Sequence, residues 1–424
     1  MDAFDFLDEP YKEVNPGYIS EAEQEFISKM LAKGGVSLKE ARLKNGVNIN
    51  DGYVISEGFL YGDEIKYVSF YFEDSAYSNY YLNIDSITDR NLKDCIKKKL
   101  ERETKNLTYL SCNDLIGSLQ GLEGAISIGI LRLQFNSAID LSPIAQFNNI
   151  TELDINLGKD LDLRQVGILK TLKTLSLSQL NVNNSEAIKN LTSLTSLAIY
   201  RVNGFDFSVI NDLTALKVLS VESEKFDAID FSKLTQLEEL NVIGSDRGNV
   251  NLSVLNPLSN LKKLSIYGAN IAKLPKLNIH KITELKIVRS KLQDISNITH
   301  FKSLKILKLT NNNLAEVPDL GQLTNLEVVD VSKNLLMDIS FLEYSNNLKV
   351  AYVFNNGLTD LSPIYKLPNL ILLHAQGNQI TDISGIESMN QLLDLILVGN
   401  PIVDCYPATK LKKLIGTHWC EVSE

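Results

Sequence analysis

Apolar residues recur along most of the chain at a spacing of 22 residues. The segment LKILKLTNNNLAEVPDLGQLTN begins at Leu304, and three further segments of that length begin at Leu326, Leu348 and Leu370. Each opens with the pattern LxxLxLxxN, in which other apolar residues replace some leucines. Such self-similarity predicts one structural unit repeated along the chain. Fourteen units are found, starting at Leu107, Ile128, Ile150, Leu172, Leu194, Leu216, Leu237, Leu261, Ile282, Leu304, Leu326, Leu348, Leu370 and Leu392.

The first half of each unit predicts a short strand. The last two apolar positions of LxxLxL are two residues apart, so both side chains point to the same face. One such strand cannot bury its apolar face alone, whereas stacked neighbours share a continuous core. The second half reads xIxDIxxLxxL in about a dozen residues, which leaves room for a tight turn and about one 3₁₀ turn. The aspartates of this half, such as Asp294, Asp338 and Asp382, are expected to cap these turns.

An asparagine ends the strand pattern in several units. Its amide is expected to satisfy backbone groups of the turn and of the next unit. It is replaced by other residues in the middle of the chain, where a less regular array is expected. The asparagine is present at Asn136, Asn312, Asn334, Asn356, Asn378 and Asn400, whereas Gly158, Leu180, Val202, Glu224 and Ser245 stand at the same place in other units.

This 22-residue pattern resembles the SDS22-like leucine-rich repeats, which include bacterial internalins and a regulatory subunit of protein phosphatase 1. The resemblance covers residues 107 to 404. It implies an α/β solenoid: a leucine-rich repeat arc with a parallel concave sheet and a convex side of 3₁₀ helices and turns. It implies binding of a protein partner but does not identify that partner. Surface internalins carry a signal peptide and a C-terminal stalk or anchor, and this sequence is not expected to share them.

The regions flanking the array differ from it in composition. Residues 1–105 contain nine of the sixteen tyrosines and no 22-residue period, and they predict a small N-terminal α+β cap domain of no recognised family. We expect helices over 20–33 and from Thr88, strands in YVISEGFLY and KYVSFYFED, and a possible strand in SNYYLNID. We expect residues 405–424 to form a C-terminal cap, in which ATKLKKLIG predicts an amphipathic helix and Trp419 is expected to seal the end.

Charge and cysteine content narrow the classes of function. A net charge of −10 counts against nucleic acid and anionic membranes as partners. No stretch is apolar enough to cross a membrane. Four cysteines are too few for a disulfide framework, and Cys405 and Cys420 are expected to be free thiols in a cytoplasmic protein. Secretion without a Sec signal is the alternative location.

No motif predicts catalysis, a cofactor or a metal. The four histidines, His280, His300, His374 and His418, lack metal-site spacing, and no phosphate loop or GxSxG occurs. The chain is therefore expected to be non-enzymatic and to need no cofactor. Two alternatives stay open: a catalytic N-terminal domain with repeats that select the substrate, and a bacterial effector acting on a host protein. A phosphatase-regulator role is a further possibility.

The outward strand positions predict the binding surface, because solenoids bind partners on their concave face. In the last three units these positions are apolar or aromatic, which is typical of an interaction site. The alternatives are that the C-terminal cap or a second copy covers them, or that they only broaden the sheet. A smaller candidate lies in the middle of the array, around Tyr200, Arg201, Glu222 and Tyr267. The predicted partner-binding residues are Val350, Tyr352, Phe354, Leu372, His374, Gln376, Ile396, Val398, Tyr200 and Tyr267.

Overall fold

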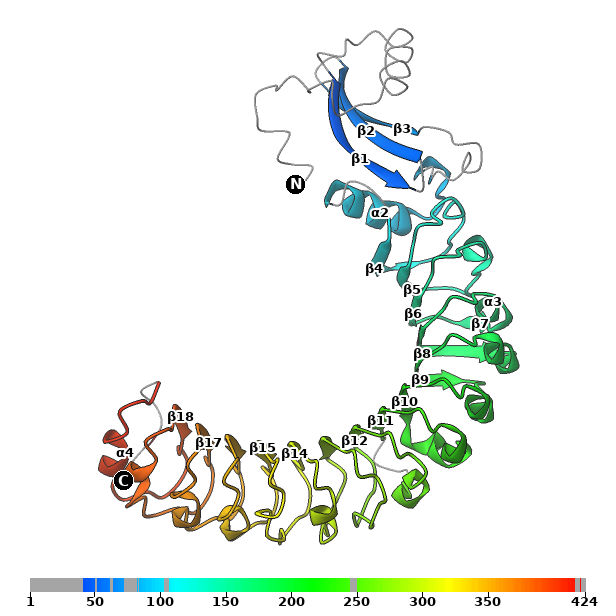
Figure 1. Cartoon of the computed structure of the whole chain (residues 1–424). Coiled ribbons are helices and arrows are strands. Elements are labelled where there is room, and N and C mark those ends of the chain that lie inside the picture. The colour runs from blue at the N-terminus through cyan, green and yellow to red at the C-terminus, as the bar shows by residue number, and fades with distance from the viewer. Residues whose placement is uncertain are drawn as a thin grey trace.

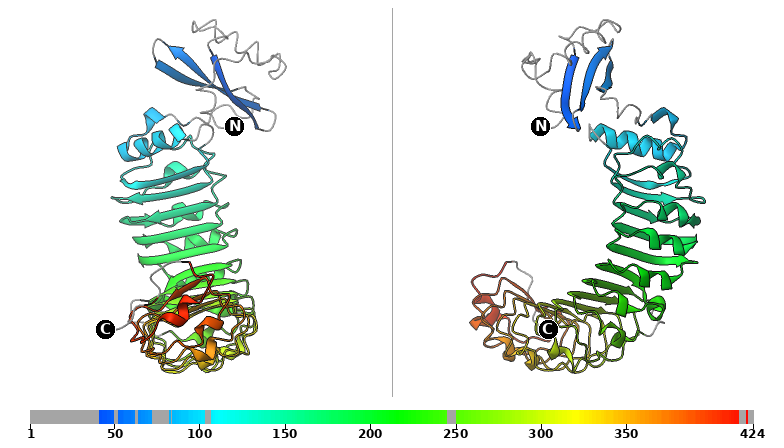
Figure 2. Two further views of the ribbon diagram at one scale, coloured as in Figure 1. Left: turned by 90° about the vertical axis from the view of Figure 1, so that its left-hand side faces the viewer. Right: turned by 45° about the vertical axis from the view of Figure 1, so that its right-hand side comes forward.

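The repeats form one long, curved, parallel sheet. The computed structural model describes residues 41–49, 52–61, 64–71, 82, 84–102, 107–244, 250–415 and 420. Its fifteen-stranded sheet runs in chain order, except that β7 pairs only with β8. The strands line the inner side of the arc and the turns lie on its outer side (Figures 1 and 2). The predicted solenoid with a concave parallel sheet is therefore confirmed.

The strands of the arc shorten toward its C-terminal end. Those of the middle have five to ten residues, apart from the short β7, and those from β14 onward have three. The strands are β4 (Tyr109–Ile116), β5 (Ile130–Phe135), β6 (Glu152–Asn156), β7 (Asp160–Asp162), β8 (Thr174–Asn183), β9 (Ser196–Asn203), β10 (Val218–Glu222), β11 (Glu239–Ile243), β12 (Lys263–Tyr267), β13 (Glu284–Val288), β14 (Ile306–Lys308), β15 (Val328–Asp330), β16 (Val350–Tyr352), β17 (Leu372–His374) and β18 (Asp394–Ile396).

The convex side consists mainly of 3₁₀ turns, as predicted. A four-residue α-helix, α3 (Arg164–Gly167), replaces one of them. The turn aspartates cap their turns as expected; Asp294, for example, accepts a hydrogen bond of 2.8 Å from the amide of Ser296. The 3₁₀ helices of the array are η3 (Ser142–Ile144), η4 (Ser185–Asn190), η5 (Phe207–Asp212), η6 (Ser223–Ala228), η7 (Phe231–Lys233), η8 (Leu252–Leu255), η9 (Ile298–His300), η10 (Ser340–Leu342), η11 (Ser362–Ile364) and η12 (Ile386–Ser388).

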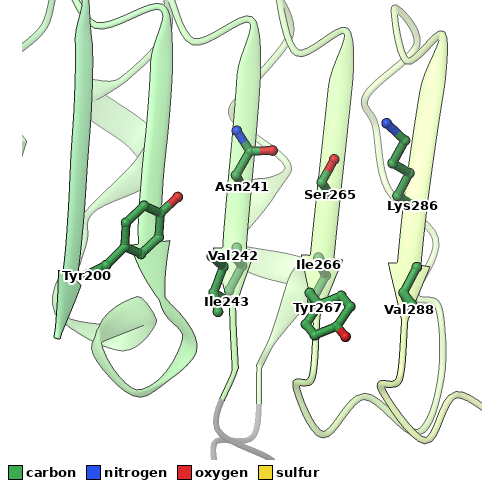
Figure 3. Close-up of a pocket in the computed structure, with 9 residues that line it drawn as sticks. All are labelled: Tyr200, Asn241, Val242, Ile243, Ser265, Ile266, Tyr267, Lys286 and Val288. Carbon is green, nitrogen blue, oxygen red and sulfur yellow. The ribbon is translucent and has the colours of Figure 1, made fainter. Parts of the chain in front are cut away.

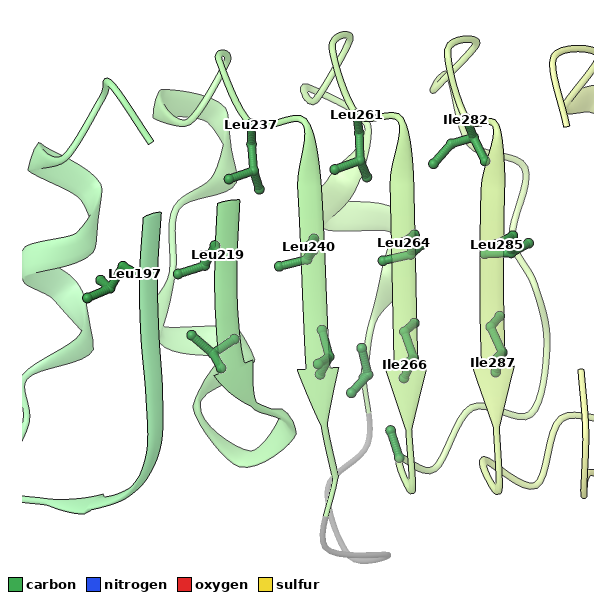
Figure 4. Close-up of a cluster of buried hydrophobic side chains, with 14 of the residues drawn as sticks. Leu197, Leu219, Leu237, Leu240, Leu261, Leu264, Ile266, Ile282, Leu285 and Ile287 are labelled. Carbon is green, nitrogen blue, oxygen red and sulfur yellow. The ribbon is translucent and has the colours of Figure 1, made fainter. Parts of the chain in front are cut away.

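The core is a stack of equivalent leucines between the sheet and the turns. Leu219 lies opposite both Leu197 and Leu240, and Leu264 opposite both Leu240 and Leu285, in register across five strands. All five are at most 1% exposed, and their side chains point away from the concave face (Figure 4). Because every unit buries its leucines against its neighbours, the array has one continuous core.

The asparagines of the C-terminal third form a buried ladder. The Nδ2 of Asn378 donates to Ala375 O in its own unit (2.8 Å) and to Val353 O in the preceding unit (3.1 Å), while its Oδ1 accepts from two amides of that preceding unit. The prediction that the asparagine side chain hydrogen-bonds to the next unit is therefore wrong, because these hydrogen bonds are made with the preceding unit. Asn136 differs from the others because it is exposed and its side chain makes no such bonds.

The middle of the array replaces this ladder with longer strands. Leu180 and Val202 stand at the asparagine position, are buried, and pair with each other because β8 and β9 continue past the usual turn. The residues that directly follow Leu180 and Val202 are Asn181 and Asn203, and the Nδ2 of Asn203 donates a hydrogen bond to the Oδ1 of Asn181 at 3.0 Å. The units also vary more here than in the C-terminal third, as predicted: strands β6 to β11 range from three to ten residues, β7 pairs only with β8, and α3 replaces a 3₁₀ turn.

The described N-terminal segments contain three antiparallel strands and one helix. These are β1 (Ala41–Ile49), β2 (Gly52–Tyr61), β3 (Glu64–Tyr71) and α2 (Arg90–Arg102). β2, β3 and α2 confirm predictions, whereas β1 was not predicted. Of the predicted third strand, residues 78–81 and 83 lie outside the described residues, and its last two residues belong to a 3₁₀ turn, η2 (Ile84–Ser86). The helix expected over 20–33 lies outside the described residues, and the domain boundary at 105 stays a prediction.

Both ends of the array carry a disulfide. Cys95 of α2 is bonded to Cys112 of β4, and Cys405 is bonded to Cys420. The expectation of free thiols is therefore wrong, because the folded chain brings each pair together. Helix α2 also buries Leu92 and Ile96 completely in the common core. It therefore covers the first strand of the array.

The C-terminal cap has less helix than predicted. Helix α4 covers only Tyr406–Thr409. The chain then turns back toward the sheet, where Ile415 N donates to Leu393 O at 2.9 Å. Pairing with the last unit thus competes with continuation of the helix. Trp419 lies outside the described residues.

Candidate functional site: the concave face

The predicted C-terminal residues lie together on the concave face. Strand register places Tyr352 opposite His374, and His374 opposite Ile396. All eight side chains are half-buried, although the described part of the cap is in place. We call this group the C-terminal patch: Val350, Tyr352, Phe354, Leu372, His374, Gln376, Ile396 and Val398.

Polar contacts hold the centre of the C-terminal patch. The ring of His374 meets that of Tyr352 edge-on, with centroids 5.1 Å apart. The Nε2 of His374 lies 3.0 Å from Asp394 Oδ2, so the carboxylate orients the imidazole. His374 is 17% exposed and Asp394 45%, so the solvent reaches the acid more readily than the ring. These contacts hold the Tyr352 and His374 rings in defined positions on the concave face.

Two polar atoms beside Phe354 have no partner. Ser332 Oγ and Gln376 Oε1 are both buried without a hydrogen bond among the described residues. Ser332, Phe354 and Gln376 are spaced by 22 residues and occupy equivalent places in adjacent units. Unpaired buried polar atoms are uncommon, and a ligand or water can satisfy them. Ser332 is fully buried, whereas Gln376 is partly exposed beside Phe354.

The sequence prediction missed part of this apolar surface. Ile306 and Val328 continue the row of Val350 and Leu372 across the two preceding strands. A second row at the strand entrance consists of Ile371, Leu393 and Ile415, linked by consecutive backbone hydrogen bonds and exposed by 37%, 37% and 78%. The sequence contains a signal for this second row, namely a change from charged to apolar residues at one position of the repeat. The equivalent positions in the preceding units are Lys305, Glu327 and Lys349.

The second predicted group lies in the middle of the arc. Tyr200 and Tyr267 border an open hollow of about 370 Å³ (Figure 3). Burial raises the pKa of Tyr200, and Tyr267 is 44% exposed. Arg201 and Glu222, predicted with them, pair locally, since Arg201 N donates to Glu222 Oε1 at 2.8 Å. The residues that line the hollow are Tyr200, Asn241, Val242, Ile243, Ser265, Ile266, Tyr267, Lys286 and Val288.

The two groups do not form one site. Tyr267 belongs to β12 and Tyr352 to β16, so three strands lie between them. Among the described residues, no three histidine, cysteine or acidic side chains gather as a metal site would require. No helix in the described part is long and apolar enough to cross a membrane.

Comparison with known proteins agrees with this architecture. A family model described as Leucine Rich repeats (2 copies) matches residues 302–344 and 346–388. The chain thus carries leucine-rich repeats and folds as a leucine-rich repeat solenoid. No curated protein matches the sequence.

Solved structures with the same fold come from distant organisms. An internalin, inlF, from Listeria monocytogenes is 22% identical with a TM-score of 0.57, over 78% of this chain and 95% of its own. The LRR protein LIC12759 from Leptospira interrogans is 20% identical with the same TM-score, over 76% and 91%. Toll in complex with Spatzle from Drosophila is 15% identical with a TM-score of 0.54, over 90% and 60%. At these identities the likeness concerns the fold alone.

Proposed function

We propose that this chain is a non-enzymatic binding module whose C-terminal patch holds a protein partner. The observation that carries the proposal is the continuous apolar and aromatic surface of β16 to β18, half-exposed on a preformed concave sheet. Large exposed apolar patches mark interaction sites, and aromatic residues commonly dominate binding energy. In the Toll structure, a protein of the same fold is complexed with Spatzle.

The proposed mechanism is recognition by a rigid surface. Each patch residue follows or belongs to a strand that is hydrogen-bonded to its neighbours, so little backbone must be ordered when a partner binds. Tyr352 and Phe354 supply the aromatic anchors. Asp330 and Gln376 supply polar groups at the rim, whereas Ser332, also predicted there, is fully buried. We expect each anchor to contribute about 2 kcal/mol or more to binding.

A charge-introducing double variant tests this assignment. Tyr352→Glu with Phe354→Glu places two carboxylates in the patch, and we expect it to abolish partner binding while the fold survives. The matched control is Tyr344→Glu, because Tyr344 is 61% exposed in the turn region outside the sheet. The wild type and both variants would be used as baits in affinity purification from the native host. A partner lost only from the double variant supports the assignment, whereas a partner retained by all three baits refutes it.

The disulfides support an oxidising compartment rather than the cytoplasm. Cytosolic thiols are kept reduced, and stable disulfides are typical of secreted proteins. We therefore propose that the protein acts outside the cytoplasm, as an internalin-type 22-residue repeat protein, with a bacterial effector role as one form of this proposal. Mass measurement after alkylation of unreduced protein from the host tests it. Four alkylated cysteines would contradict the proposed location but not the binding surface.

A further inference from the structure

The hollow in the middle of the arc has an apolar row beside a polar row. Strand register places Tyr267 between Ile243 and Val288, and Ser265 between Asn241 and Lys286. The rows are two residues apart on every strand, so both face the concave side (Figure 3). Ile243 and Tyr267 are 43% and 44% exposed. The hollow therefore offers an apolar contact surface that the described residues leave partly uncovered.

Glu222 does not fill the space between Tyr200 and Ile243. It lies opposite Ile243 on β10, but its Oε1 accepts the hydrogen bond from the backbone amide of Arg201. This bond directs the carboxylate toward β9. Tyr200 of β9 and Ile243 of β11 thus border the same hollow, with the strand of Glu222 between them.

A cation borders the apolar row. The guanidinium of Arg289 lies over the ring of Tyr267, 5.6 Å from its centroid. Among the described residues, no carboxylate lies within ion-pair distance of this guanidinium. Lys286, by contrast, is paired with Glu284 on the same strand. Arg289 is therefore a positive group at the edge of the hollow without an acidic partner among the described residues.

The hollow is open to solvent over one side. A small molecule generally binds where most of its surface becomes buried. An open hollow instead suits a side chain that belongs to a longer chain lying across the strands. Tyr267 offers exposed apolar ring surface, and Arg289, whose guanidinium lies over that ring, favours a carboxylate through a bidentate pair.

We propose that this hollow binds an acidic segment of a protein partner, with a bulky apolar side chain on Ile243 and Tyr267 and a neighbouring Asp or Glu on Arg289. This inference rests on the proposed binding function and adds a second contact with defined chemistry. The hollow is separated from the C-terminal patch by three strands, so substitutions in one leave the other intact.

Fluorescein-labelled nonapeptides provide the probe. Each has a central phenylalanine, flanked by two aspartates, two serines or two lysines, and binding to the full chain is followed by fluorescence anisotropy. We expect the aspartate peptide to bind at least tenfold more tightly than the serine peptide, and the lysine peptide most weakly. Ile243→Asp should abolish binding, and Arg289→Gln should remove the preference for aspartate over serine.

The control is Lys333→Gln. Lys333 and Arg289 share the same left-handed backbone conformation, with φ of 55° and 51°, but Lys333 lies two units away. This variant should retain the aspartate preference. Absence of binding, equal binding of the three peptides, or an unchanged preference in Arg289→Gln would each overturn the inference. Loss of the aspartate preference in the Tyr352→Glu/Phe354→Glu variant would also overturn it, because the ligand would then occupy the C-terminal patch. Failure of the peptides leaves the proposed function standing, since its test uses the native partner and another surface.

Discussion

Replacing Asn378 by alanine tests the physical role of the buried asparagine ladder. Asn378 is 1% exposed and makes four hydrogen bonds. The two carbonyl oxygens to which Asn378 donates would each keep another donor in the variant. Asn356 Nδ2 also donates to Val353 O, and Asn400 Nδ2 also donates to Ala375 O. Among the described residues, however, the amides of Asn356 and Leu358 have only Asn378 Oδ1 as a partner, at 3.2 and 3.1 Å.

The variant should therefore leave two backbone amides without a partner. Each such group costs about 1–3 kcal/mol, so we expect a loss of about 2–6 kcal/mol in the free energy of unfolding. A matched control is Asn369→Ala, since Asn369 is exposed and donates a single hydrogen bond to Asn346 O. We expect that substitution to cost about 1 kcal/mol or less.

Two measurements check the magnitude and the place of the effect. Urea unfolding followed by circular dichroism compares the two variants with the wild type. Hydrogen exchange then reports on the amides of Asn356 and Leu358, which should lose protection in Asn378→Ala. Equal midpoints for the two variants, or unchanged protection of both amides, would refute the claim that the side chain satisfies these groups.

Three further predictions concern the scaffold. Gly204 has a φ of +78°, and an added Cβ would lie 2.3 Å from a backbone carbonyl oxygen. Gly204→Ala should therefore lower the free energy of unfolding by at least about 2 kcal/mol. An unchanged midpoint in thermal or urea unfolding would contradict this. Cys95→Ser with Cys112→Ser opens a link between residues 17 apart and should cost about 3 kcal/mol, with faster hydrogen exchange in α2; equal exchange would argue against a stabilising bond. The pKa of Asp294 is lowered to about 2, chiefly by its hydrogen bond with Lys273. Because the pKa of this carboxyl group is higher in the unfolded chain, ionised Asp294 stabilises the fold above pH 4, and this stabilisation is lost as the pH falls toward 2. Asp294→Asn should therefore flatten the plot of unfolding free energy against pH in that range.

Local pattern was sufficient to predict the repeat architecture. The 22-residue period, the two inward positions of each strand and the aspartate-capped turns depend on residues close in sequence, and each is repeated many times. The concave positions followed from the same alternation, which is why the C-terminal patch could be predicted residue by residue. Its extension through Ile306 and Val328 needed the strand register across units.

Features that depend on distant residues were predicted poorly. The asparagine ladder bonds to the preceding unit because that unit's orphan amides face it, a relation that no single unit contains. Leu180 and Val202 are buried because β8 and β9 extend together, so an apolar residue replaces a polar one without loss. The C-terminal helix is short because Ile415 returns to pair with Leu393.

The sequence by itself thus determined the fold class, the direction of each strand and which side chains of each strand lie on the concave face, since these follow from period and alternation alone. Tertiary structure decided which side chains act together. It paired the cysteines, seated His374 on Asp394, and brought Arg289 over Tyr267 beside Ile243. The physical reason is that a repeat defines where a residue stands within its unit, whereas contacts arise between units, where neighbouring side chains differ.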